Sequence, residues 1–181
     1  MKKIILGLLC VFTLLFIVTP KASARGYHKH DHDVPENAVL ISSESKVAKN
    51  GGYIVYDLYE NVDDTSSYAV ATATTYAATS TYTKTGTKTV TKYDSNNKIL
   101  WRYVLSATFT VNEGVSATCT SASYTKTINN TFWKFSNGSA KKSGATANGK
   151  GKFTYKILWL FSGETVSIDI NLTCNQYGVL S

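Results

Sequence analysis

Hydrophobic and polar residues alternate along most of the chain from Tyr53 onward. In the longest run, from Ile99 to Val111, nearly every second residue is apolar. A period of two places these side chains on one face of a strand and predicts that this face is buried. The residues expected on it are Trp101, Tyr103, Leu105, Ala107, Phe109 and Val111.

The pattern of apolar residues also predicts an all-β domain, because no helical period is visible after the apolar stretch at 4–18. Asn112, Glu113 and Gly114 predict a tight hairpin, and further turns are expected at Ser143–Gly144 and Ser162–Gly163. Short strands at this spacing favour an antiparallel β-sandwich of immunoglobulin-like size, with a barrel as the alternative. The other predicted strands are 53–58, a segment within 68–93, 115–119, 131–141, 145–159 and 165–174.

The first 24 residues have the pattern of a secretory signal peptide. Lys2 and Lys3 precede an apolar stretch at 4–18, and small residues at 22–24 form a cleavage site. We therefore expect a signal peptide at 1–24, a flexible polar lead-in at 25–52 and an antiparallel β domain at 53–181. No C-terminal apolar anchor is visible, so we expect a secreted protein, with retention at the cell envelope as an alternative.

Cys119 and Cys174 are the cysteines that remain after cleavage, since Cys10 leaves with the leader. In an oxidising compartment two cysteines usually pair, and a disulfide across a loop of this length stabilises by about 4 kcal/mol in the chain-entropy model. We therefore predict a Cys119–Cys174 disulfide.

Charge is distributed unevenly along the chain. From Thr65 onward twelve basic residues face four acidic ones, whereas the segment from Arg25 to Asp64 is acidic. A basic β surface on an exported protein favours an anionic cell-wall polymer or a membrane surface as partner, and an extracellular protein is a third possibility. The plain alternative is that the charge only maintains solubility. We expect no nucleic-acid partner and no cofactor.

His28, His30 and His32 are the only histidines, and they alternate with polar residues in the predicted lead-in. Three imidazoles in a short tract can capture zinc, copper or nickel, whereas a solvated polar linker is the ordinary interpretation. The β domain therefore lacks a histidine base for a Ser/His or Cys/His nucleophilic centre. A secreted hydrolase would depend on two carboxylates, but Asp94, Glu113 and Glu164 fall in predicted turns.

Threonine occupies every odd position from Thr79 to Thr91, which aligns seven hydroxyl and methyl groups on one face of a strand. Such a row can order water or pack another strand, but an ice-binding face requires several adjacent rows, and one row is visible. The ordinary interpretation is β-propensity on an exposed or edge strand. Lys84, Lys88 and Lys92, on the opposite face, would then discourage edge aggregation.

Leu158, Trp159, Leu160 and Phe161 form an apolar run that breaks the alternation. Such a run is either a core strand or an exposed hairpin tip that contacts a membrane or a protein. Trp101 and Trp133 could likewise stack on sugar rings or belong to the core.

The segment from Tyr93 to Ser181 resembles a group of small exported proteins of Gram-positive bacteria. The residues concerned are Phe109–Gly114, Cys119, Thr120, Trp133, Lys141–Ala147 and the ending LTCNQYGVLS. The resemblance implies an exported bacterial β domain, and it implies no reaction and no catalytic residue.

Three functions follow as hypotheses. The first is a secreted non-catalytic binding domain at the cell envelope or in the medium. The second is a membrane-active, bacteriocin-like protein that uses the apolar tip, and the third is a carboxylate-dependent hydrolase.

Overall fold

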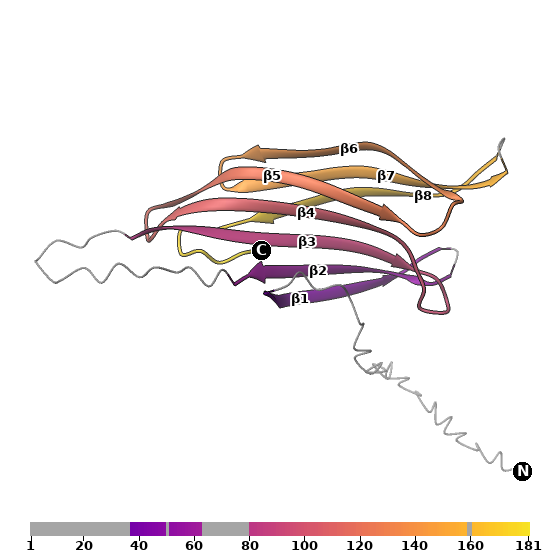
Figure 1. The fold of residues 1–181 in the computed structure, drawn as a ribbon, viewed down its shortest axis with the longest axis horizontal. Helices are drawn as coiled ribbons and strands as arrows, with labels where there is room; N and C mark the ends of the chain where they lie inside the picture. Colours follow the sequence, from indigo (N-terminus) through magenta and orange to yellow (C-terminus); the bar gives the residue numbers. More distant parts are fainter. Residues whose placement is uncertain (1–36, 50, 63–79, 159–160) are drawn as a thin grey trace, which may run out of the picture. The chain divides into compact units, whose positions relative to one another are not determined.

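The computed structural model describes residues 37–49, 51–62, 80–158 and 161–181. These residues form two antiparallel sheets, one of five strands in the order β1-β2-β3-β4-β5 and one of three in the order β6-β7-β8 (Figure 1). The predicted all-β, sandwich-like fold is confirmed. The strands are β1 Ala38–Val47, β2 Tyr53–Asn61, β3 Thr81–Tyr93, β4 Ile99–Asn112, β5 Ser116–Ile128, β6 Trp133–Ser143, β7 Thr146–Leu158 and β8 Phe161–Thr173.

Strand β4 shows most clearly how the sequence forms the fold. Its residues alternate strictly between buried and half-buried positions from Trp101 to Asn112. All six residues predicted for the inner face are buried, with exposures of 0–2 %. The predicted turn after Asn112 is also present, and Gly114 adopts a positive φ of 73° there, which glycine accepts without strain.

The core lies between β4 and the three-stranded sheet. Trp101 of β4 stacks on Phe153 of β7 with ring centroids 4.0 Å apart, and Trp133 of β6 meets Trp101 edge-on at 5.8 Å. Tyr103 donates a hydrogen bond across the core to the carbonyl of Ser139, at 3.0 Å. Glycine at 149 leaves room for this tyrosine, because a Cβ there would lie 2.9 Å from the Tyr103 hydroxyl oxygen.

The predicted lead-in at 25–52 extends too far toward the C-terminus. Residues 38–47 within it form β1, which pairs antiparallel with β2 from Ala38↔Asn61 to Val47↔Tyr53. Nearly every residue of β1 is exposed on both faces. A strand with no buried face has no hydrophobic period, which is why the sequence pattern does not show it.

Strand β3 lies between β2 and β4, so of the two predicted settings, an exposed or an edge strand, the edge strand is wrong. Each of its three lysines has a polar partner, and Lys84 pairs with Glu60 of the neighbouring strand β2. Lys88 donates to the carbonyl of Asn171 at 2.9 Å, and Lys92 forms an ion pair with Glu164 at 3.2 Å. They therefore do not protect an edge, and Lys92 is almost completely buried.

The turn between β7 and β8 lies earlier than predicted. Leu158 pairs with Phe161, so the chain reverses between them, and not at Ser162–Gly163. Residues 159–160 lie outside the described part of the chain. Among the described residues, no helix has the length and apolar character needed to cross a membrane.

Candidate functional site: the outer face of the three-stranded sheet

Lysine side chains gather on the outer face of the three-stranded sheet. Residues that pair directly across antiparallel strands lie on the same face. On β7 the inner positions are Ala147, Gly149, Gly151 and Phe153, which are buried, so the even-numbered residues between and after them face outward. We call the outward-facing lysines of β6 and β7 the lysine face: Lys134, Lys141, Lys150, Lys152 and Lys156.

The register between the strands brings these lysines close together. Lys150 lies opposite Ser139 on one side and Asp169 on the other, and Lys152 lies opposite Ser136 and Ser167. Asp169 is the one acidic residue on this face among the described residues, and its carboxylate is 3.1 Å from the Lys150 ammonium. Both side chains of that pair are more than half exposed, so it stabilises the fold little and leaves the face basic.

The remaining positions of the face carry short polar side chains, including Thr154, Thr165 and Asn171. Four of the lysines are exposed and Lys156 is half-buried. An open face with five cations and small hydroxyl side chains presents a positive potential without a pocket wall. It is suited to a repeating anionic partner and not to a small molecule that must be enclosed.

The predicted disulfide is absent, since Cys119 and Cys174 are free and buried. The Cys119 thiol donates to the carbonyl of Ser121 at 3.2 Å, and its backbone N–H bonds to Gly144. The backbone N–H of Cys174 donates to the carbonyl of Ala145, the residue that follows Gly144. The turn between β6 and β7 therefore lies between the backbones of the two cysteines.

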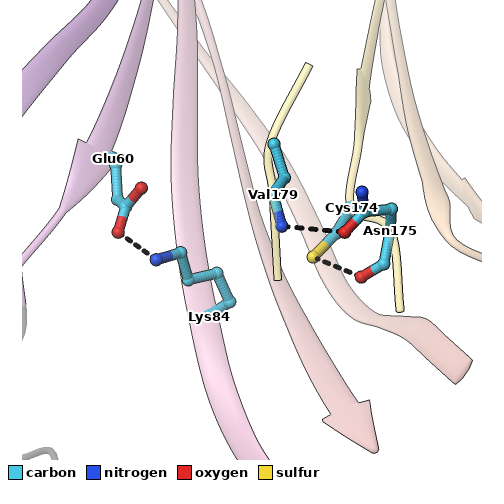
Figure 2. Close-up of polar contacts among 5 residues, drawn as sticks. All are labelled: Glu60, Lys84, Cys174, Asn175 and Val179. Carbon is cyan, nitrogen blue, oxygen red and sulfur yellow. Dashed lines mark hydrogen bonds and ion pairs between the residues drawn. The ribbon is translucent and has the colours of Figure 1, made fainter. Parts of the chain in front are cut away.

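The two thiols also have different surroundings. Burial raises the pKa of both, but Lys142 acts on the pKa of Cys119, whereas Lys84 and Glu60 act on that of Cys174. Figure 2 shows the Glu60–Lys84 ion pair beside the segment that carries Cys174. A thiol that is buried and kept protonated is a poor nucleophile, so neither cysteine is suited to catalysis in this state.

The C-terminal segment is held by the side chain of Asn175, whose amide oxygen accepts a hydrogen bond from the backbone N–H of Val179 (Figure 2). The same oxygen accepts a second hydrogen bond, from the backbone N–H of Tyr177. The turn returns the chain so that Leu180 pairs with Cys174. Leu180 is buried and lies against Gly86 of β3. The last residues therefore close one end of the core.

The tryptophans proposed for sugar stacking belong to the core. Trp101 is 0 % and Trp133 3 % exposed, and both rings contact other aromatic rings. Their indole N–H groups have no hydrogen-bond partner. Since neither ring reaches the surface, they cannot stack on a sugar bound there.

Part of the apolar tip lies outside the described residues, and the side chains of Leu158 and Phe161 are likewise not described. The described neighbours at this end of the molecule are apolar and exposed. Phe132 is 53 % and Ile157 58 % exposed, and the Phe132 ring lies 5.9 Å from that of Tyr155. Lys156, the member of the lysine face that directly precedes Ile157, adjoins this apolar end.

The three carboxylates that sequence analysis assigned to turns, Asp94, Glu113 and Glu164, have structural partners. Asp94 accepts hydrogen bonds from the backbone N–H groups of Asn96 and Lys98, which is the turn chemistry expected from the sequence. Glu113 accepts from the hydroxyl of Ser80 at 2.5 Å, and Glu164 is paired with Lys92. The three carboxylates therefore have different partners, and none of these contacts joins two of them.

The histidine tract His28, His30 and His32 lies outside the described residues. Within the described part of the chain, no group of three or more His, Cys, Asp or Glu side chains could hold a metal ion. The lysine face was not predicted from sequence as a site, although the spacing Lys150, Lys152 and Lys156 at even positions of a predicted strand is a signal that could have indicated it.

Comparison with known proteins finds no matching family model, no similar curated protein and no similar solved structure. The similarity to exported Gram-positive proteins therefore remains a prediction, and only the surface of this chain bears on its function.

Proposed function

We propose that this protein is a secreted, non-catalytic binding domain that attaches to an anionic polymer of the cell envelope through the lysine face. The observation that supports the proposal is the clustering of five lysines on one sheet face, where Asp169 is the single acidic residue among the described ones. Five of the twelve basic residues that follow Thr65 lie on this face.

The physical basis is multivalent charge attraction. Each exposed lysine contributes little by itself, but several ammonium groups on a fixed strand spacing contact several phosphates or carboxylates of one polymer together. Ions screen such contacts beyond a Debye length of about 10 Å at 0.1 M salt, so binding should weaken steeply as salt rises. A polymer also needs no enclosed pocket, which agrees with the open face.

The test is cosedimentation of the purified protein with Gram-positive cell walls, before and after chemical removal of their anionic teichoic polymer. Lys134→Gln/Lys152→Gln removes two charges from the lysine face, and Lys49→Gln/Lys98→Gln removes two exposed charges from turns elsewhere. We expect the first variant to bind several-fold more weakly and the control to bind like the wild type. Equal loss in both variants, or no wild-type pelleting with intact walls, would contradict the proposal.

A membrane-active protein is the second candidate, and the exposed apolar end favours it. Phe132 and Ile157 are apolar and exposed, and Ile157 lies near the end of the hairpin that β7 and β8 form. Leakage of dye from anionic lipid vesicles distinguishes the two candidates. A membrane-active protein should release dye, and Phe132→Ser/Ile157→Ser should reduce the release, whereas a wall-binding protein should leave the vesicles intact.

A further inference from the structure

Strand β1 forms an exposed edge of the five-stranded sheet. It pairs with β2 on one side, and no described strand lies on its other side (Figure 1). Nine of its ten residues are exposed. The opposite edge differs, because there the backbone N–H of Cys119 on β5 bonds to the carbonyl of Gly144. An edge strand presents a row of backbone N–H and C=O groups to solvent, so β1 can pair with a further strand.

The regular part of this edge runs from Ser42 to Val47. The pairing with β2 shifts by one residue between Leu40 and Ser42, and it then continues without interruption to Val47. The three-stranded sheet packs mainly against β3, β4 and β5, so β1 extends beyond it. Another strand can therefore approach this part of β1 without meeting the second sheet.

Geometry limits how two copies of this edge can pair. Successive residues of a strand point their N–H and C=O groups alternately toward the neighbour on one side and toward the other side. When two copies of β1 pair antiparallel, residues that point outward must face residues that point outward. The two-fold axis therefore passes through a residue and not between two residues. The axis is perpendicular to the sheet, because opposing residues lie on the same face.

Glu44 and Lys46 then select one register. They lie at alternate positions on one face of β1, and both side chains are more than half exposed. An axis through Glu44 or Lys46 would set like charges opposite each other, and an axis through Ser43 would set Glu44 opposite Ser42. An axis through Ser45 sets Glu44 of each copy opposite Lys46 of the other. Opposite charges that face each other across antiparallel strands attract, whereas like charges repel.

We propose that the protein forms a symmetric dimer in which two β1 strands pair antiparallel about Ser45. The two five-stranded sheets then join into one continuous sheet. A second copy fits this edge because Glu44 and Lys46 make the strand complementary to itself. A lone lysine on an edge strand discourages pairing, but here Glu44 leaves β1 without net charge. On the other face, Val47 is 83 % exposed and would lie opposite Ser43.

The dimer does not depend on the wall binding proposed above, since β1 carries no residue of the lysine face. It would nevertheless change how that face is presented. Because the two-fold axis is perpendicular to the sheet, the lysine faces of both copies would point to the same side. One polymer could then contact both faces, which increases the strength of attachment without a new contact.

The first experiment is sedimentation equilibrium of the purified protein up to millimolar concentration. Glu44→Lys leaves two lysines on each strand, and Lys46→Glu leaves two glutamates, so each variant opposes like charges in the dimer. A mixture of the two variants restores both opposite-charge pairs between different copies. Asp169→Lys, at the similarly exposed pair with Lys150 on the other sheet, is the matched control. Near-ultraviolet circular dichroism of the stacked aromatic core verifies that each variant is folded.

The second experiment tests the register by oxidative crosslinking. Ser45→Cys places each new thiol opposite its own copy, with Cα atoms about 4.5–5.5 Å apart, a separation that a disulfide spans. Ser43→Cys changes an exposed serine on the same face of the same strand and is the control, because it would lie opposite Val47. Gel electrophoresis without reductant measures the crosslinked dimer.

We expect the wild type and Asp169→Lys to dimerise. Glu44→Lys and Lys46→Glu should each self-associate several-fold more weakly, and their mixture should recover the dimer. Ser45→Cys should crosslink and Ser43→Cys should not. A wild type that stays monomeric overturns the proposal. A dimer that survives both charge reversals, or that Ser43→Cys crosslinks as readily as Ser45→Cys, uses another surface or register, and the proposal is then wrong.

Discussion

The ammonium group of Lys92 on β3 lies 3.2 Å from the carboxylate of Glu164 on β8, so a buried ion pair joins the two sheets. The side chains are 2 % and 10 % exposed. The ammonium also lies 5.9 Å from the centre of the Trp133 ring. A charge buried this deeply is tolerated only when it has a partner. Substitution of either residue therefore tests how the two sheets pack on each other.

Lys92→Met should lower the free energy of unfolding by about 3–5 kcal/mol, because it leaves the Glu164 carboxylate buried without its partner. The double variant Lys92→Met/Glu164→Leu should recover most of this loss, since no charge then remains in the core. Urea unfolding measures both, and Lys150→Met at the exposed pair with Asp169 is the control, with a cost below about 1 kcal/mol. A single variant as stable as the wild type would show that the pair is not buried in solution.

The two cysteines should behave as unreactive thiols. Their burial and raised pKa values predict that a thiol reagent at pH 8 labels neither Cys119 nor Cys174 in the native protein and labels both after unfolding. The melting temperature should be the same with and without a reducing agent. A reductant that lowers the melting temperature by several degrees would instead show that the disulfide forms in the folded protein.

Leu180 and Gly86 should be energetically coupled. A Cβ at position 86 would lie 2.6 Å from a methyl carbon of Leu180, so Gly86→Ala should destabilise by about 1–3 kcal/mol through overpacking. Leu180→Ala should cost about 2–4 kcal/mol through the cavity that it leaves. In the double variant the new methyl occupies part of that cavity, so the combined cost should be smaller than the two single costs together. Additive costs in urea unfolding would contradict this contact.

Stability should fall in alkaline solution partly because of Tyr103. Burial, followed by the nearby Tyr124, raises its pKa to about 12. The folded pKa lies above the unfolded value of about 10, so this contribution is complete below pH 10 and is lost as the pH rises toward 12, by up to about 3 kcal/mol. Unfolding free energies measured across this range should fall less steeply for Tyr103→Phe. An identical slope in the variant would assign the pH dependence to other groups.

The strands of the core could be predicted from sequence because they alternate over many residues. Strand β1 could not, since its exposure on both faces removes the pattern. The turn between β7 and β8 was placed too late, because Ser162 and Gly163 are turn formers that here lie within β8. The Cys119–Cys174 disulfide was predicted because two cysteines remain in an expected oxidising compartment. Neither the compartment nor the number of cysteines specifies whether the two backbones come close together.

The candidate sites depend on the register between neighbouring strands. Lysines at alternate positions of β6 and β7 are ordinary strand sequences. They become a surface only when the register places Lys150 opposite Ser139. The exposed edge of β1 likewise follows from its place beside β2. One threonine row and a general basic charge can be seen in the sequence, whereas the surfaces that strand pairing creates cannot.

The amino-acid sequence alone determined that the chain is an all-β domain and which face of β4 is buried, because side-chain direction in a strand follows from local alternation. Tertiary structure decided that the cysteines stay separate, that the lysines of β3 turn inward toward partners such as Glu164, and that the lysine face and the exposed edge strand β1 form. These features depend on which strands become neighbours and in what register, and that is set by the packing of the whole core and not by any local stretch of residues.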